Sequence, residues 1–202
     1  MGNEDDSENS YKVPTKVGIN DILNQDKDDA ALENYKKQLL GVERYSPRDD
    51  PRRVVIVEMH VIFENRPSGD ISFCELDQSD ALNKLKNEKG LVFKEGCKYK
   101  LKFVFRVQHD IVTGLHYVNK VYKAKSGIRV AKEMLMLGSY PPQEKTHEVV
   151  YPRNGWEKTP SGMLARGSYR STIAFIDDDN VTHLKFEYNF SIRKDWASED
   201  DS

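Results

Sequence analysis

The 202-residue chain has little of what several large protein classes require. It holds only two cysteines, Cys74 and Cys97, without a CxxC spacing and without histidines at metal-ligand offsets. This scarcity favours a reducing compartment, where we expect both thiols to be small buried side chains and not a disulfide. The apolar runs are far shorter than the ~20 residues that a membrane-spanning helix needs, so we expect no stable membrane insertion.

A strong excess of one charge is also lacking. Lys and Arg number 31 against 33 Asp and Glu, which gives a net charge of -2 and a pI near 6.2. A nucleic-acid surface needs a clustered basic excess, so we expect no nucleic-acid partner. Glu4, Asp5 and Asp6 stand where a secretion signal would be basic and then apolar, which favours the cytosol.

Catalytic motifs are absent as well, including GxSxG, HExxH and the Walker loop. The five histidines are scattered through predicted strands and turns. The acidic run 177–179 offers neighbouring carboxylates, but such a run in a turn is more typical of a solvated turn than of an acid–base site. We therefore expect no catalytic residue, no metal and no cofactor, and we favour a binding protein over an enzyme.

Residues 1–50 differ from the rest of the chain. They hold twelve acidic and seven basic residues, and the first part has too few apolar side chains to offset the entropy of ordering, which predicts disorder. Between residues 17 and 41, apolar side chains recur at helical spacing and end at Gly41, which predicts a helical hairpin. We predict a flexible regulatory arm over 1–50 and a single body over 51–202.

The body predicts strands separated by turn signals about every ten residues, which is typical of an all-β sandwich. In residues 99–107, apolar side chains such as Tyr99, Leu101 and Phe103 alternate with basic ones, so they share one face of a strand. An acidic turn over 177–180 predicts a hairpin between its flanking runs. The strands are predicted at 54–63, 70–76, 91–94, 99–107, 111–122, 132–136, 145–151, 163–176 and 184–192.

A series of short motifs runs in order through nearly the whole chain. Together they resemble the Rho GDP-dissociation inhibitor family. The motifs are Tyr11-Lys12-Val13-Pro14, Leu23-Asn24-Gln25-Asp26-Lys27-Asp28-Asp29, Leu39-Leu40-Gly41, Phe93-Lys94-Glu95-Gly96, Phe105-Arg106-Val107, Met136-Leu137-Gly138-Ser139-Tyr140-Pro141, Gly162-Met163-Leu164-Ala165-Arg166-Gly167-Ser168-Tyr169, Asp177-Asp178-Asp179 and Ile192-Arg193-Lys194-Asp195-Trp196.

The resemblance implies an immunoglobulin-like β-sandwich with a flexible N-terminal arm that contains the helical hairpin. It also implies a 1:1 complex with a prenylated Rho/Rac/Cdc42-type small GTPase. In this family the arm holds the switch regions of the GTPase and slows GDP release, while the sandwich takes the geranylgeranyl group between its sheets. The two actions together extract the GTPase from membranes and keep it soluble in the cytosol.

The resemblance further implies which residues contact the GTPase. An alternative from the residues alone is that Asp29 only caps a helix and that the two leucines only pack inside the hairpin. The GTPase-contact residues carried over by motif are Tyr11, Asp28, Asp29, Leu32, Tyr35, Leu39, Leu40, Ser139, Asp178 and Asp179.

The lipid pocket is carried over in the same way. Its implied residues are Val61, Leu91, Ile111, Tyr169, Ile173, Phe186 and Tyr188. Each is an apolar or aromatic residue in a predicted strand, so ordinary core packing remains the alternative. Phe186 and Tyr188 stand where the family usually has tryptophans, which would reshape the pocket. Arg153 and Lys158 flank Glu157 in a segment that is usually acidic in the family.

Two other functions stay open at the level of sequence. One is a related prenyl-binding sandwich that carries its cargo without inhibiting nucleotide exchange and needs no helical clamp. The other is a sandwich hydrolase or carbohydrate-binding module that uses exposed carboxylates and histidines. The second predicts ligand contacts on the surface and not in the interior.

Overall fold

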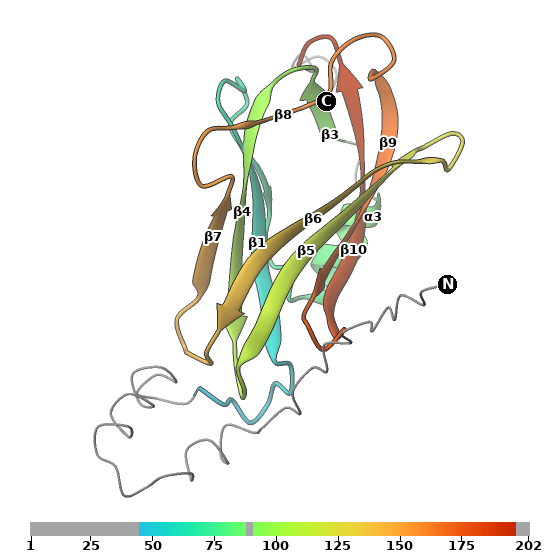
Figure 1. Ribbon diagram of the computed structural model, residues 1–202. Helices are drawn as coiled ribbons and strands as arrows, with labels where there is room; N and C mark the ends of the chain where they lie inside the picture. Colours follow the sequence, from blue (N-terminus) through green and yellow to red (C-terminus); the bar gives the residue numbers. More distant parts are fainter. Residues whose placement is uncertain (1–44, 88–90, 197–202) are drawn as a thin grey trace, which may run out of the picture.

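The computed structural model describes residues 45–87 and 91–196, which fold into two packed β-sheets with one short helix (Figure 1). This arrangement confirms the predicted all-β sandwich. The elements are β1 (Val54–Phe63), β2 (Ile71–Phe73), α3 (Ser79–Asn87), β3 (Leu91–Lys94), β4 (Lys98–Val107), β5 (Val112–Lys123), β6 (Arg129–Tyr140), β7 (His147–Tyr151), β8 (Glu157–Lys158), β9 (Gly167–Ile176) and β10 (Thr182–Arg193).

The first sheet has the order β2-β1-β4-β7, and β8 pairs with β4 beside β7. The second sheet has the order β3-β10-β9-β5-β6. Its pairings are antiparallel except for β3 with β10, which run parallel. The predicted hairpin around the acidic turn is confirmed, because β9 pairs with β10 from Ile176 opposite Thr182 to Gly167 opposite Ile192.

Alternating side chains explain why these segments form strands with one buried face. On β4, Phe103, Phe105 and Val107 are fully buried, whereas Lys102 and Arg106 between them are partly exposed. The same period of two appears on β9, where Ile173 and Phe175 are fully buried. A period of two places every second side chain between the sheets, which is the pattern of a half-buried strand.

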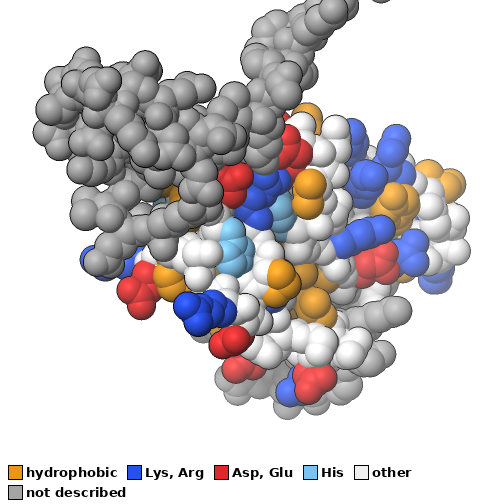
Figure 2. Space-filling model, turned by 90° about the horizontal axis from the view of Figure 1, so that it is seen from below, with side chains coloured by type: hydrophobic (Ala, Val, Ile, Leu, Met, Phe, Trp, Pro, Cys, Tyr) orange, Lys and Arg blue, Asp and Glu red, His pale blue; other side chains and the backbone are white. Residues whose placement is uncertain are grey.

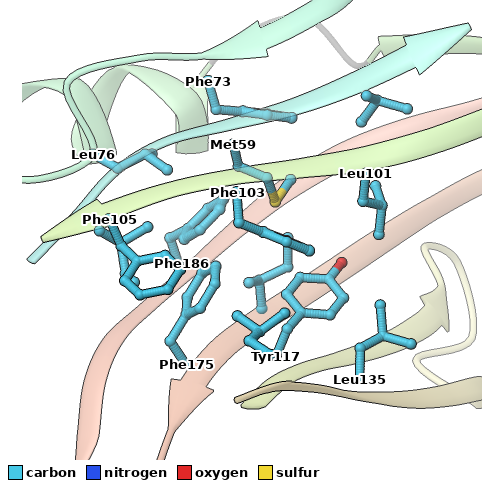
Figure 3. Packing of buried hydrophobic residues seen from close by; sticks show 14 of the residues in the cluster. Met59, Phe73, Leu76, Leu101, Phe103, Phe105, Tyr117, Leu135, Phe175 and Phe186 are labelled. Carbon is cyan, nitrogen blue, oxygen red and sulfur yellow. The ribbon is translucent and has the colours of Figure 1, made fainter. Parts of the chain in front are cut away.

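Aromatic rings from both sheets meet in the core (Figure 3). The ring of Phe103 on β4 lies 4.9 Å from that of Tyr117 on β5 and 5.7 Å from that of Phe175 on β9, measured between centroids. Tilted and edge-to-face rings at such separations are the preferred packing of aromatic pairs. This part of the space between the sheets is therefore filled by side chains.

The structure differs from the sequence predictions at one helix and at the two cysteines. Helix α3 was not predicted, because its apolar side chains Leu82 and Leu85 form too short a pattern to mark a helix, although they pack on the core. Cys74 is exposed and Cys97 is half-buried, so the prediction that both are buried is wrong. Cys74 directly follows the buried Phe73 on β2, and alternation turns its side chain outward.

The predicted disordered tail and helical hairpin lie outside the described residues. So do seven of the predicted GTPase-contact residues, Tyr11, Asp28, Asp29, Leu32, Tyr35, Leu39 and Leu40. Within the described ranges, no helix is long and apolar enough to cross a bilayer.

Candidate functional site

A cavity of about 560 Å³ lies between the two sheets, towards the end at which β4 begins and β10 ends. Its size falls within the ~300–1,000 Å³ that is usual for small-molecule sites. The wall is mainly apolar and aromatic, as such sites require. These lining residues are Val61, Phe93, Tyr99, Leu101, Tyr117, Val121, Val130, Ala131, Pro160, Leu164, Tyr169, Tyr188, Phe190 and Ile192.

Short side chains account for the open space. Packed sheets lie ~10 Å apart, so facing side chains must together span that distance to fill the interior. Val61 on β1 and Val121 on β5 line the cavity, as do Val130 and Ala131 on β6. None of these four can reach across, whereas Phe103 and Phe105 on β4 and Phe175 on β9 fill the space between the sheets further along. The sandwich is thus filled in one half and open in the other.

Burial disfavours ionisation of three tyrosines of the wall, Tyr99, Tyr117 and Tyr188, by raising their pKa values. Burial raises the pKa of Tyr188 to about 12, although a hydrogen bond with Ser171 acts in the opposite direction. Burial likewise raises the pKa of Tyr117 and that of Tyr99 well above their usual value. The Ser171 hydroxyl donates to Asn119 Oδ1 at 2.5 Å. Ser171 thus gives the Tyr188 hydroxyl an uncharged hydrogen-bond partner.

The loop over residues 162–167 is held at the mouth of the cavity by two sets of contacts. Arg166 donates to both carboxylate oxygens of Glu95, at 2.9 and 2.6 Å, and the Gly162 amide donates to Glu95 Oε2 at 2.8 Å. The bond from Arg166 is the largest cause of the lowered pKa of Glu95. On the other side, the Tyr169 hydroxyl donates to the Ala165 carbonyl at 2.5 Å. A loop fixed in this way keeps its apolar tip in a defined place.

That tip exposes two large apolar side chains. Met163 is 84% exposed and Leu164 is 94% exposed. Leu164 also lines the cavity. Exposed apolar side chains at the entrance of an apolar cavity are more typical of a binding site than of ordinary protein surface.

Three of the seven predicted lipid-pocket residues line the cavity, namely Val61, Tyr169 and Tyr188. Ile173 and Phe186 belong to the buried core, and Leu91 and Ile111 are half-buried. Among the described residues, those four do not line the cavity. The sequence prediction did not include Phe93, Tyr99, Leu101 and Phe190. For Tyr99 and Leu101 a signal was present, because the alternation of residues 99–107 already placed them on the inward face.

At the opposite end of the sandwich, the acidic turn is organised around a buried carboxylate. Asp177 is only 1% exposed. Its Oδ1 accepts the amides of Asp179 and Val181, both at 3.0 Å, and its Oδ2 accepts from His183 Nε2 at 2.8 Å and from Arg53 Nη2. The interpretation of the whole run as a solvated turn is therefore wrong for Asp177. A short polar side chain that accepts backbone amides two and four residues on stabilises such a turn.

The pKa values of this cluster are shifted in a consistent way. Burial alone would raise the pKa of Asp177, but the Val181 amide, His183 and Arg53 lower it below the usual value. Burial lowers the pKa of His183, and the adjacent Asp177 only partly opposes that effect. Arg53 also donates to Asp179 Oδ2 at 3.1 Å. The start of β1 is thereby joined to the acidic turn by a charge-assisted network.

Residues 45–53 pack against the same end through further hydrogen bonds. The His109 amide donates to the Tyr45 carbonyl, and the Gln108 amide donates to the Arg53 carbonyl, both at 2.9 Å. Figure 2 views this end and shows acidic, basic and histidine side chains gathered side by side. The segment that leads into β1 is thus anchored before the strand begins.

The three predicted GTPase-contact residues within the described ranges come together at this end. Ser139 Oγ accepts the Gly114 amide at 2.9 Å, and the Asp178 amide donates to the Thr113 carbonyl at 3.1 Å. Gly114 has a positive φ of 55° and lies directly against the Asp178 carboxylate. A strand end on β6 and the turn between β9 and β10 are therefore brought together through residues 113–114.

Taken together, the fold and the cavity define an all-β sandwich with a mainly apolar cavity between its two sheets. Within residues 45–87 and 91–196, no group of three or more His, Cys, Asp and Glu side chains is arranged to hold a metal ion.

Comparison with known proteins gives the family. The family model described as RHO protein GDP dissociation inhibitor matches residues 1–195. A putative rho GDP-dissociation inhibitor 1 of Dictyostelium discoideum is 46% identical over 198 residues and covers 98% of each chain. Rho GDP-dissociation inhibitor 1 of Homo sapiens is 37% identical over 96% of this chain and 90% of its own. That of Arabidopsis thaliana is 41% identical over 89% of this chain and 71% of its own. The chain belongs to the Rho GDP-dissociation inhibitor family.

Proposed function

We propose that this protein is a Rho GDP-dissociation inhibitor that binds a prenylated Rho-type GTPase one to one, without catalysing a reaction. It slows GDP release, shelters the geranylgeranyl group of the GTPase between its sheets, and holds the complex in the cytosol. The observation that carries the proposal is the apolar cavity of about 560 Å³ inside the sandwich.

The energetic requirement supports an interior site. Each CH₂ group of a lipid gains roughly 0.8 kcal/mol when it leaves water, and a bilayer offers that gain in full. A soluble protein can extract the lipid only if it buries a comparable apolar surface. The aromatic wall formed by Tyr99, Tyr169, Tyr188 and Phe190 offers such a surface, and an exposed groove would not.

The GTPase itself would be bound at the end that carries the acidic turn. Ser139, Asp178 and Asp179 gather there beside the anchored segment 45–53. That segment contains the end of the predicted arm, so a GTPase held by the arm would lie close to the turn. We assign the contacts of the arm to Tyr11, Asp28, Asp29, Leu32, Tyr35, Leu39 and Leu40, as the sequence predicts.

A release assay tests the lipid-binding part of the proposal. Liposomes loaded with prenylated or unprenylated Rho-type GTPase are mixed with the protein, and the GTPase released into the supernatant is measured. We expect the protein to increase the amount of prenylated GTPase in the supernatant and to leave the amount of unprenylated GTPase unchanged. Ala131→Trp should abolish the release, because the indole fills the cavity. Ala124→Trp is the matched control, since Ala124 is also exposed and does not line the cavity. Equal behaviour of the two variants would refute the cavity as the lipid site.

A nucleotide-release assay separates an inhibitor from a carrier of prenylated cargo. The protein should slow dissociation of a fluorescent GDP analogue from the prenylated GTPase. Asp29→Ala and Asp179→Ala should weaken this effect while lipid binding persists. An unchanged dissociation rate in the presence of saturating protein would favour the carrier.

A further inference from the structure

The cavity has an apolar interior but a basic rim. Its charged lining residues are Lys123, Lys132 and Lys158 on the positive side and Glu133 on the negative side. They come from the consecutive strands β5 and β6 and from β8, which lies further along the chain, and the three strands meet at this cavity. An accidental run of lysines along one strand would not give this arrangement. We call Lys123, Lys132 and Lys158 the basic rim.

The charge of the basic rim is not neutralised by neighbouring carboxylates. Lys123 Nζ donates to the Tyr169 hydroxyl at 2.8 Å and to the Leu164 carbonyl at 3.2 Å, and both acceptors are uncharged. Lys132 and Lys158 form no side-chain hydrogen bond or ion pair with any residue that the structure describes. The ammonium groups of Lys132 and Lys158 are thus available to an anionic ligand. That of Lys123 is held in place by uncharged acceptors and keeps its charge unpaired with a carboxylate.

The single carboxylate of the lining, that of Glu133, offsets only one of the three ammonium charges, so the charged lining residues keep a net positive charge. Burial raises the pKa of Glu133, and the nearby Glu157 raises it further. A cleft with walls of low dielectric and one dominant sign of charge concentrates its field on the entering ligand.

We propose that the basic rim binds an anionic group at the polar end of the lipid, namely the free α-carboxylate of a C-terminal S-prenylated cysteine. This inference rests on the proposed function, because it specifies which form of the prenylated partner the cavity selects. A free α-carboxyl group has a pKa near ~3.5 and is ionised at neutral pH, whereas its methyl ester carries no charge. The carboxylate would lie at the mouth, where the rim is, and the hydrocarbon inside.

Charge complementarity is the reason for choosing this occupant over a neutral one. Exposed ion pairs are worth roughly 0.2–1 kcal/mol each, which corresponds to about 1.4- to 5-fold in affinity per lysine. Two available lysines should therefore favour the carboxylate over the ester by about fivefold at low salt. Because the rim is exposed to solvent, the preference should shrink as the ionic strength rises.

The test is a titration of the full chain with two short peptides that end in S-geranylgeranyl cysteine, one with a free carboxylate and one with a methyl ester. Affinity is followed through a fluorophore at the other end of the peptide, in low and high salt. We expect the carboxylate to bind about fivefold more tightly in low salt. The double variant Lys132→Gln/Lys158→Gln should bring the two affinities together by weakening the carboxylate form only.

The double variant Lys145→Gln/Lys185→Gln is the matched control, because it removes the same charge from exposed lysines that do not line the cavity. It should keep the preference. If both peptides bind equally to the wild-type protein, or the ester binds more tightly, the anion site is refuted while the lipid-binding function stands. If neither peptide binds, the proposed function itself fails.

Discussion

The two halves of the sandwich obey the same alternation but end in different interiors. Near the acidic turn, Phe103, Phe105 and Phe175 are fully buried, and two of them meet ring to ring. Towards the other end, Tyr99 and Leu101 on the same strand β4 face a cavity of about 560 Å³. The comparison teaches that the period of a strand decides which side chains point inward, whereas their lengths decide whether the interior is closed.

The strongest test of this contrast lies on β4, where Leu101 and Phe103 point inward two residues apart. Phe103→Ala should lower the free energy of unfolding by about 3–5 kcal/mol, because it leaves a void among packed rings. Leu101→Ala should cost about 2 kcal/mol, the low end of the range for leucine, since it enlarges a space that is already open. Urea denaturation measures both. A larger loss for Leu101→Ala would break the comparison between a filled half and an open half.

The next largest effect concerns the buried carboxylate of the turn. Asp177→Asn should lower the free energy of unfolding by about 3 kcal/mol, because Arg53 and His183 would lose their charged partner in a partly buried cluster. Asp178→Asn is the matched control, since its side chain is exposed and should change stability by less than about 0.5 kcal/mol. Similar losses for the two neighbours would mean that Asp177 does not organise the turn.

A smaller effect is expected at Gly114. An added Cβ there would lie 2.1 Å from the Asp178 carboxyl group, so Gly114→Ala must displace at least the side chain of Asp178. Gly155 also has a positive φ, but no atom lies within 4 Å of the Cβ position, so Gly155→Ala reports backbone strain alone. We expect Gly114→Ala to cost about 1–3 kcal/mol more than Gly155→Ala. It should also weaken GTPase binding, whereas Gly155→Ala should not.

The smallest effect is a dependence of stability on pH. The folded-state pKa of His183 is lowered, so folding favours the neutral ring. Its contribution is complete above the unfolded value of ~6.5 and is lost as the pH falls through the folded pKa. The midpoint of urea unfolding should therefore decrease between pH 7 and pH 5, and less so in His183→Gln. An identical decrease in both proteins would exclude His183 as a source. The lowered pKa of Asp177 has the same sign but acts only below ~4.

Much of the fold could be predicted because it depends on local pattern. The bounds of β1 and β3 match the predicted strands at 54–63 and 91–94, since apolar runs and turn signals fix them. The two-residue strand β8 could not be predicted, because it is too short to show a period. Its pairing with β4 depends on a partner that is more than fifty residues away.

The candidate site was harder to predict from the sequence. Three consecutive aspartates give no local reason why Asp177 is buried while Asp178 and Asp179 are exposed. Asp177 is enclosed by the amides of its own turn, by His183 and by Arg53, and Arg53 is distant in the sequence and reaches the turn only after folding. In the same way, Phe186 and Tyr188 both point inward on β10, but only Tyr188 lines the cavity. Which of them does so depends on the side chains of the opposite sheet.

The most direct test of the account is where the lipid lies. Methyl-labelled full-length protein is titrated with a geranylgeranylated peptide, and shifts of the methyl resonances are recorded by NMR. We predict large shifts for methyl groups that line the cavity, such as those of Val61, Leu101 and Val121, and small shifts for Val107 and Val112 in the filled half. Large shifts confined to exposed methyl groups outside the cavity, such as those of Met134 and Met136, would contradict the account.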